Sequence, residues 1–257
     1  MSELLLSWAA ALPAILAVAL VAWAIATARR NVGLVDIFWS LFFLAGAAVY
    51  ALDGIDARGG VVLALAAVWG IRLACHLAWR NWNAEEDRRY REIRARNEPH
   101  FALKSVYLVF GLQAVLAWLI SAPLFAAFRG AADLNALDAA GIGLVAFGVL
   151  FEAVADWQLA RFKGDRANAG KVMDRGLWRY TRHPNYFGEF CVWWGFWLIA
   201  CAAGGAWTVF APLLMTFLLL RVSGVALLEK DIGQRRPGYR EYVRRTNAFF
   251  PGPTKHA

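Results

Sequence analysis

Residues 174–189 read DRGLWRYTRHPNYFGE, and a long apolar run begins inside this stretch at Phe187. The stretch gathers arginine and histidine among tryptophan and tyrosine, and Pro184 ends any helix that arrives from the amino-terminal side. Such residues are typical of the flank of a transmembrane helix. They also suit an anionic or planar ligand at a membrane surface. The stretch therefore predicts a membrane-embedded chain with a cationic segment at one surface.

The composition also places the chain in a bilayer. Of its 257 residues, 60% are hydrophobic, and a globule of this size has too little interior to bury them. No basic residue precedes the first apolar run and no small-residue cleavage site follows it, so residues 1–28 indicate a retained span rather than a cleaved signal. The three cysteines lack metal-ligand spacing, so we expect neither a disulfide framework nor a metal site.

Seven apolar runs approach the roughly 20 residues that a helix needs to cross a hydrocarbon core. They are Leu4–Ala28, Val32–Leu52, Gly60–Trp79, Val106–Phe128, Ala139–Ala160, Phe187–Ala203 and Trp207–Leu228. With these spans, one side of the membrane receives 23 of the 27 Lys and Arg residues, and that side is the cytoplasmic one. The sequence therefore predicts an all-α, polytopic seven-helix bundle with its amino terminus outside and its carboxyl terminus in the cytoplasm. We see no internal repeat or linker and expect one membrane domain over residues 1–257.

Ionisable residues inside the spans are costly and mark candidate functional positions. They are Asp36, Arg72, His76, Glu152, Asp156, Glu189, Arg221 and Glu229. Most fall in the cytoplasmic half of their spans, so we expect them to converge on one polar cavity that opens towards the basic loops. Residues four apart share a helix face, which groups Arg72 with His76 and Glu152 with Asp156. Each could instead form a structural ion pair, for example Asp36 with Arg72.

The loop 161–182 mixes basic side chains with glycines, a composition that can wrap phosphate groups. No glycine-rich fingerprint follows a strand, so a Rossmann domain is excluded and any dinucleotide must bind between helices. Gly141, Gly143 and Gly148 lie in the fifth apolar run, where small residues indicate close helix packing rather than a phosphate loop.

Residues 182–189, the Gly-Tyr-Arg-Glu-Tyr sequence at 238–242 and the Phe-Phe-Pro sequence at 249–251 together resemble the carboxyl-terminal half of membrane steroid 5-alpha-reductases and their bacterial relatives. The amino-terminal half resembles them more loosely, through 31–40 and 69–90. The shorter His-Pro-x-Tyr-x-Gly pattern is shared with isoprenylcysteine carboxyl methyltransferases. The resemblance to a bacterial member implies a multi-pass protein of the bacterial inner membrane.

The reductase resemblance implies NADPH as the cofactor, held by residues 139–257 with cytoplasmic loops closing over it. Residues 1–128 would enclose the substrate. The positions that match cofactor contacts are Asp156, Lys163, Lys171, Asn185, Tyr186 and Glu189, with Arg179, Arg182, His183, Glu229, Tyr239 and Tyr242 as further candidates.

In that family a carboxylate of the second span and a phenol of the third polarise the 3-keto group of the substrate. Asp36 is the matching carboxylate. The third span here has no tyrosine, so its polar groups Arg72 and His76 join Asp36 as catalytic candidates. Tyr90, in the following loop, is the nearest phenol. The candidate substrate contacts are Asp36, Trp39, Trp69 and Tyr90. Asp36 either donates a proton or stays ionised and orients Arg72 or His76.

The function expected is NADPH-dependent reduction of the carbon-carbon double bond of a hydrophobic enone, with a delta-4 3-keto steroid as the best single candidate. The alternative is an S-adenosylmethionine-dependent methyltransferase. The basic loops suit the several negative charges of NADPH better than the methyl donor, which carries no phosphate, and a small methyltransferase does not require seven spans. A transporter would place polar residues through the whole membrane depth, and the outer half has few. We expect membrane lipids and a hydrophobic small molecule as partners, with neither nucleic acid nor an obligate protein partner.

Overall fold

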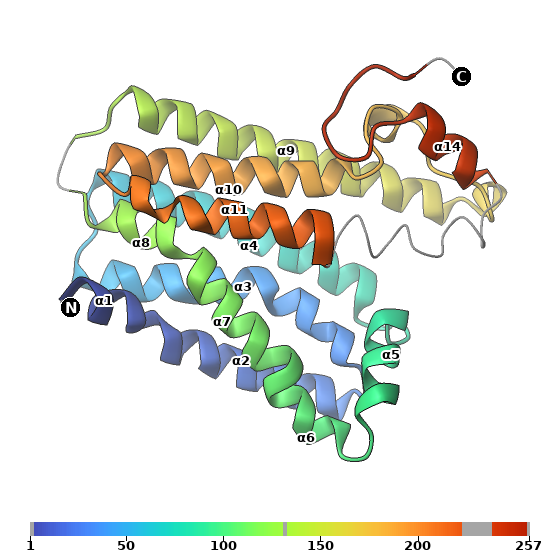
Figure 1. Cartoon of the computed structure of the whole chain (residues 1–257), viewed down its shortest axis with the longest axis horizontal. Helices are drawn as coiled ribbons and strands as arrows, with labels where there is room; N and C mark the ends of the chain where they lie inside the picture. The colour runs from blue at the N-terminus through green and yellow to red at the C-terminus, as the bar shows by residue number, and fades with distance from the viewer. Residues whose placement is uncertain (1–2, 131–132, 223–237, 256–257) are drawn as a thin grey trace. The chain divides into compact units, whose positions relative to one another are not determined.

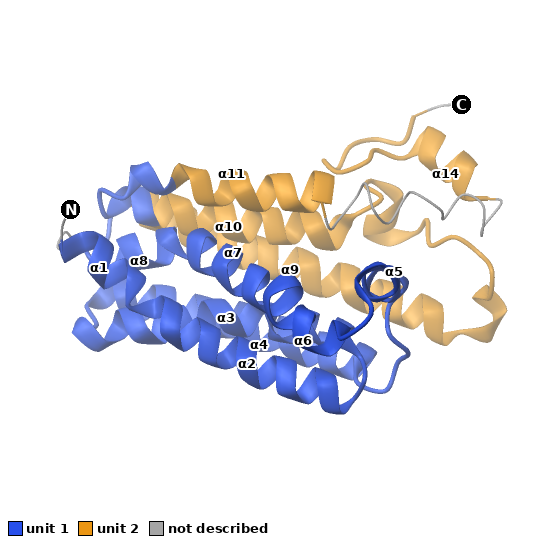
Figure 2. Cartoon of the chain, turned by 60° about the horizontal axis from the view of Figure 1, so that its bottom comes forward, with its two compact units in different colours: residues 1–135, 200–208 blue, residues 136–199, 209–257 orange. Residues whose placement is uncertain are grey.

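The structure is a computed structural model that describes residues 3–130, 133–222 and 238–255. All regular elements among these residues are helices (Figure 1). The chain divides into two compact units, shown in different colours in Figure 2. Unit 1 comprises Met1–Asn135 and Ala200–Thr208, and unit 2 comprises Ala136–Ile199 and Val209–Ala257. The expectation of a single domain stays a prediction.

Unit 1 contains the amino-terminal helices. They are α1 (Glu3–Ala9), α2 (Ala11–Ala28), η1 (Val32–Leu34), α3 (Val35–Tyr50), η2 (Ala51–Asp53), α4 (Ala57–Asn81), α5 (Arg88–Asn97), α6 (Phe101–Ser105), η3 (Val106–Gly111), α7 (Leu112–Ile120), α8 (Ala122–Phe128) and, from the later segment, η6 (Ala206–Val209) up to Thr208. Helix α3 packs against both α2 and α4 and forms the centre of the unit.

The helices of unit 1 bury small residues and expose large apolar ones. The buried face of α2 consists of Ala11, Ile15, Ala19, Ala22 and Ala26. Leu20 and Val21 on the same helix are more than half exposed. This distribution is the reverse of a soluble helix, and it is the one expected where lipid surrounds the bundle and small residues let helices approach closely.

Polar side chains join the central helices of unit 1. The Ser40 hydroxyl of α3 donates a 2.8 Å hydrogen bond to the carbonyl oxygen of Gly70 in α4. Near the other end of α3, the hydroxyls of Tyr50 and Ser121 lie 2.8 Å apart. Both contacts are buried, so α3 is held at each end by a hydrogen bond that has no competition from water.

Unit 2 contains the later helices. They are α9 (Ala136–Gly164), η4 (Arg166–Asn168), η5 (Gly176–Arg179), α10 (Pro184–Ala202) up to Ile199, α11 (Phe210–Phe217), η7 (Leu218–Val222) and α14 (Tyr239–Arg245). Helix α10 begins at Pro184, a first-turn position where the missing backbone N–H is not needed.

Helices α9 and α10 cross at two pairs of glycines. A Cβ added at Gly148 would lie 2.6 Å from the carbonyl oxygen of Gly188, and one at Gly141 would lie 2.7 Å from that of Gly195. The glycines of each pair are seven residues apart on their helix, so both pairs face the same seam. The expected packing role of Gly141 and Gly148 is therefore confirmed. A Cβ at Gly143 would meet nothing within 4 Å, so the packing role expected for Gly143 is wrong.

Five helical segments of the described chain are long and apolar enough to cross a membrane. They are Glu3–Ala28, Val32–Asp53, Ala57–Asn81, Phe101–Ile120 and Ala136–Gly164. They correspond to the first five expected spans and support a multi-pass membrane protein. The fourth ends near Ser121 rather than Phe128, because Pro123 cannot continue the hydrogen-bond ladder of α7.

The count of seven spans is not confirmed. Helix α10 has 19 residues, but Asn185 and Glu189 lie in its first two turns, and it is not among the five segments that qualify by length and hydropathy. The apolar segment Ala206–Val222 is shorter than the five. The last part of the expected seventh span lies outside the described residues.

Candidate functional site

A carboxylate and a phenol meet at one end of unit 1. The hydroxyl of Tyr90 donates a 2.6 Å hydrogen bond to Oδ1 of Asp36. Asp36 lies in the first turn of α3, where the free backbone N–H groups favour negative charge. Tyr90 lies in the first turn of α5, which is capped by Asp87 through a hydrogen bond from the backbone N–H of Arg89. The fold thus joins the carboxylate of the second span to the phenol that the sequence marked as nearest.

Tyr90 is only 3% exposed. It lies against Gly33, where an added Cβ would come within 3.2 Å of the ring atom Cδ2. Burial, and after it the neighbouring Asp36 carboxylate, raise the pKa of Tyr90 well above the ordinary value of a tyrosine. The hydroxyl therefore keeps its proton and remains a donor at neutral pH.

Two further side chains complete this cluster. Nη2 of Arg89 donates a 2.8 Å hydrogen bond to Oδ2 of Asp36, and its guanidinium lies 4.3 Å from the centre of the Tyr90 ring. Nε2 of Gln113, in α7, donates a 3.3 Å hydrogen bond to the Tyr90 oxygen. The carboxylate therefore accepts from a cation and a phenol, while the phenol also accepts from an amide.

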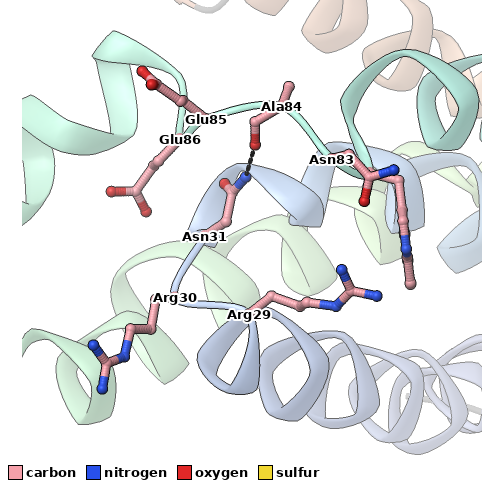
Figure 3. A pocket seen from close by; sticks show the side chains of 8 residues that line it. Arg29, Arg30, Asn31, Asn83, Ala84, Glu85 and Glu86 are labelled. Carbon is pink, nitrogen blue, oxygen red and sulfur yellow. Dashed lines mark hydrogen bonds between the residues drawn. The ribbon is translucent and has the colours of Figure 1, made fainter.

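The segment that carries Tyr90 is anchored beside the start of α3. Glu86 accepts hydrogen bonds from the backbone N–H of Val32 at 2.8 Å and from Nε and Nη2 of Arg94 at 3.0 and 2.8 Å. Asn31 donates from Nδ2 to the carbonyl oxygen of Ala84 at 3.0 Å, the dashed contact in Figure 3. Burial alone would raise the pKa of Glu86, but the bonds from Arg94 and Val32 outweigh it and lower the pKa.

The aromatic substrate candidates share one neighbour. The rings of Trp39 and Trp69 lie 5.1 and 5.7 Å, between centroids, from the ring of Phe43. Trp69 is almost completely buried. These rings form a packed apolar cluster on α3 and α4, and Trp39 is three residues along α3 from Asp36.

The catalytic candidates Arg72 and His76 lie one turn apart on α4 and are partly exposed. The His76 ring is 6.0 Å from that of Trp79. Asp36 forms an ion pair with Arg89, and the possible structural pairing of Asp36 with Arg72 stays a prediction. Arg89 and Gln113 were missed. Gln113 had a signal, because it is an amide within an otherwise apolar run.

In unit 2, Arg182 contacts the end of α14. Its Nη1 donates to the carbonyl oxygens of Thr246 and Val243 at 2.7 and 3.3 Å, and its backbone N–H donates to the carbonyl of Asn247 at 2.9 Å. A cation at the carboxyl end of a helix satisfies free carbonyls and opposes the helix dipole. The guanidinium of this cofactor candidate is therefore a helix cap.

Tyr242 is also used internally. Its hydroxyl donates to the carbonyl oxygen of Trp178, and its ring packs edge-on against Tyr239, another cofactor candidate, with centroids 5.6 Å apart. Both tyrosines are buried. Together with Arg182 they tie α14 to the segment just before α10.

The polar side chains of α9 and α10 come together. Nδ2 of Asn185 donates to Oδ1 of Asp156 at 3.4 Å. The rings of His183 and Tyr186 are stacked with centroids 5.7 Å apart. Asp156 and Glu189 are buried. Two pairs of cofactor candidates are therefore in contact near the start of α10: Asp156 with Asn185, and His183 with Tyr186.

Basic cofactor candidates lie on the surface in the last turn of α9 and in the segment after it. Lys163, Lys171 and Arg179 are exposed. Glu229 lies outside the described residues. Exposed cations can bind the phosphates of a ligand, and a buried carboxylate with a half-buried amide can bind a polar ring. Arg182 and Tyr242 fit such a ligand less well, since their polar groups already bind backbone carbonyls.

Comparison with known proteins gives two matches. A family model described as "Protein of unknown function (DUF1295)" matches residues 22–246. An uncharacterized protein of Schizosaccharomyces pombe is 25% identical over 265 residues, which cover 90% of this chain and 76% of that protein. No solved structure matches the chain significantly.

Proposed function

We propose that this chain, which belongs to the DUF1295 family, is an NADPH-dependent reductase that acts on the carbon-carbon double bond of a hydrophobic enone. A delta-4 3-keto steroid is the leading substrate class. DUF1295 is related to steroid 5-alpha-reductase-like membrane proteins, which supports the proposal. The observation that carries it is the hydrogen bond between Tyr90 and Asp36.

Reduction of an enone builds negative charge on its carbonyl oxygen, so a hydrogen-bond donor at that atom lowers the barrier. One well-placed donor contributes about 3 kcal/mol. Tyr90 has a single proton, directed in the structure at Asp36. We propose that this proton turns to the substrate oxygen on binding. Before the substrate binds, Asp36 orients the phenol by accepting its hydrogen bond. After the proton turns away, Arg89 remains as the partner that balances the charge of the carboxylate.

NADPH, when bound, supplies a hydride for the beta carbon of the enone. The residues of the chain bind the cofactor and the substrate. Lys163, Lys171 and Arg179 would neutralise the phosphate charge of the cofactor, and Asp156 with Asn185 would offer it polar contacts. Trp39 and Trp69 belong to the apolar cluster that would contact the substrate. The resulting enolate takes a proton from water at its alpha carbon, which completes the reduction.

The test is a thermal-shift comparison of detergent-purified protein with NADPH and with S-adenosylmethionine, followed by product analysis with progesterone or testosterone. We expect stabilisation by NADPH and formation of a saturated ketone. Stabilisation by the methyl donor alone would overturn the reductase and favour a methyltransferase, with which His183, Pro184, Tyr186 and Gly188 share a motif.

A further inference from the structure

Gln113 is an amide inside an apolar membrane segment. It lies in α7, within the segment Phe101–Ile120 that is long and apolar enough to cross a membrane. Every residue from Ala114 to Ile120 is hydrophobic. An amide in such surroundings is costly unless it is hydrogen-bonded. The partner of Gln113 therefore indicates what the amide does.

That partner is the phenol of Tyr90. Nε2 of Gln113 donates a 3.3 Å hydrogen bond to the Tyr90 oxygen. The phenol gives its single proton to Oδ1 of Asp36 at 2.6 Å, so its oxygen can only accept from the amide. A polar residue that served only to join two spans would bond to another span. Tyr90 instead belongs to α5, outside the five segments that can cross a membrane.

A π-helix sets the side of the helix on which Gln113 lies. The element η3 is a π-helix, and α7 continues directly from it. The buried positions are Ser105 and Val109 up to the middle of η3, and Phe110 and Ala114 after it. This shift of one residue rotates α7 by about 100° relative to an uninterrupted α-helix. Single π-helical turns inside α-helices occur frequently at functional sites.

The Tyr90 oxygen has two hydrogen-bond partners in the ranges 3–130, 133–222 and 238–255, namely Asp36 and Gln113. They use different atoms of the phenol, because Asp36 accepts its proton and Gln113 donates to its oxygen. In the proposed reaction the proton turns from Asp36 to the carbonyl of the substrate, and the bond to Asp36 is broken. The bond from Gln113 does not use that proton. It therefore holds the phenol oxygen while the proton is shared with the substrate.

The bond from Gln113 also makes the phenol a stronger donor. Hydrogen bonds in a chain polarise one another, so a donor at the phenol oxygen weakens the hold of that oxygen on its proton. Negative charge grows on the Tyr90 oxygen as the proton moves towards the substrate, and the amide N–H stabilises this charge. Burial raises the pKa of Tyr90 most strongly, and the bond from Gln113 acts in the opposite direction.

We propose that Gln113 is a positioning residue for the reduction, which holds and polarises the hydroxyl of Tyr90 and does not itself touch the substrate. The inference rests on the proposed function, because it assigns the partner of the phenol that donates to the enone. A residue that acts only through Tyr90 affects the transition state, so kcat and kcat/KM should fall together while KM changes little.

The experiment combines a binding spectrum with steady-state kinetics on detergent-purified protein. The enone of progesterone absorbs in the ultraviolet, and a hydrogen bond at its carbonyl moves this band to longer wavelength. Without NADPH, the wild type should move the band, Gln113→Met should move it less, and Tyr90→Phe should leave it as in an apolar solvent. With NADPH, Gln113→Met should lower kcat about tenfold, the contribution of one hydrogen bond.

Gln113→Asn separates the contact with Tyr90 from the presence of an amide in the membrane. Its side chain is one methylene shorter, so the donor no longer reaches the phenol, and we expect the same losses as in Gln113→Met. Gln158→Met in α9 is the control, because Gln158 accepts a 3.0 Å hydrogen bond from the backbone N–H of Leu177. This variant should lower the melting temperature and leave the displacement of the enone band unchanged.

Each outcome decides between the two proposals. A wild-type band and a wild-type kcat in both Gln113 variants would overturn the role of Gln113 and leave the reductase standing. A rise in KM at unchanged kcat would place Gln113 on the substrate and overturn the positioning role. If the wild type displaces the band but forms no reduced product, the reductase is wrong, and the band in Gln113→Met still decides the role of the amide. If the wild type does not displace the band, Tyr90 is not the donor and both proposals are wrong.

Discussion

The hydroxyl of Tyr90 lies 2.6 Å from the carboxylate of Asp36, although 54 positions separate the two residues. One belongs to the start of a membrane span and the other to a short helix outside the spans. The contact therefore couples the loop between α4 and α6 to the bundle of unit 1, at the place where the proposed reaction needs a proton donor.

Substitution of either Tyr90 or Asp36 should stop turnover while the protein still binds NADPH. Tyr90→Phe removes the donor, and we expect a fall of about 100-fold or more in kcat for enone reduction. Asp36→Asn should also abolish turnover, because the amide no longer orients the phenol. Stabilisation by NADPH should persist in both variants. Near-wild-type turnover in Asp36→Asn would remove Asp36 from the catalytic role.

The raised pKa of Tyr90 predicts a late alkaline titration. The folded state favours the neutral phenol, so its contribution to stability is complete below the unfolded pKa of about 10 and is lost as pH rises through the folded pKa. Absorbance at 295 nm should show the same phenolate count in wild type and Tyr90→Phe until unfolding. The wild type has seven tyrosines and the variant has six. If the wild type showed one more phenolate than the variant before unfolding, the raised pKa of Tyr90 would be contradicted.

The lowered pKa of Glu86 predicts loss of stability in acid. Its charged form binds Arg94 and the Val32 N–H, so this stabilisation is present above the unfolded pKa of about 4.3 and disappears as pH falls through the folded pKa. At pH 7, Glu86→Gln should cost about 2 kcal/mol. Melting temperatures measured from pH 7 down to pH 3 should converge for the two proteins. Parallel curves would show that Glu86 does not titrate in this way.

Much of this fold could be predicted from local sequence signals. Apolar length located five spans, and glycine spacing identified the α9 seam. The partners of Asp36 were harder, because helical spacing relates residues on one helix and says little about which loop returns to the helix end. Tyr90 was named only as the nearest phenol. Arg89 could not be singled out from the sequence, because many residues of its segment are basic.

The role of Arg182 shows a second limit of the sequence. The sequence motif does not distinguish an arginine that binds a phosphate from one that, like Arg182, binds the backbone carbonyls of Val243 and Thr246. Only the position of α14 distinguishes the two. The break near Ser121 is a case in which the signal was present, since Pro123 follows directly in the sequence.

The glycine seam of unit 2 predicts opposite effects for two similar substitutions on α9. Gly148→Ala would place a Cβ 2.6 Å from the Gly188 carbonyl oxygen, so the helices must separate, at a cost of about 1–3 kcal/mol. Gly143→Ala meets nothing within 4 Å and should stabilise the helix by about 0.5–1 kcal/mol. Thermal unfolding in one detergent measures both. Equal effects would mean that the seam is not tightly packed.

The capping role of Arg182 predicts that its substitution lowers stability even when no cofactor is bound. Arg182→Ala leaves the carbonyls of Val243 and Thr246 without their donor, and the cost should be about 2 kcal/mol even when no NADPH is present. Limited proteolysis should then cut near α14 faster than in the wild type. Arg179→Ala is the matched control, because Arg179 is an exposed cation three residues earlier. It should leave the melting temperature unchanged and weaken NADPH binding about tenfold. If instead Arg182→Ala melts like the wild type and loses only its response to NADPH, the guanidinium serves the cofactor and the cap contributes little.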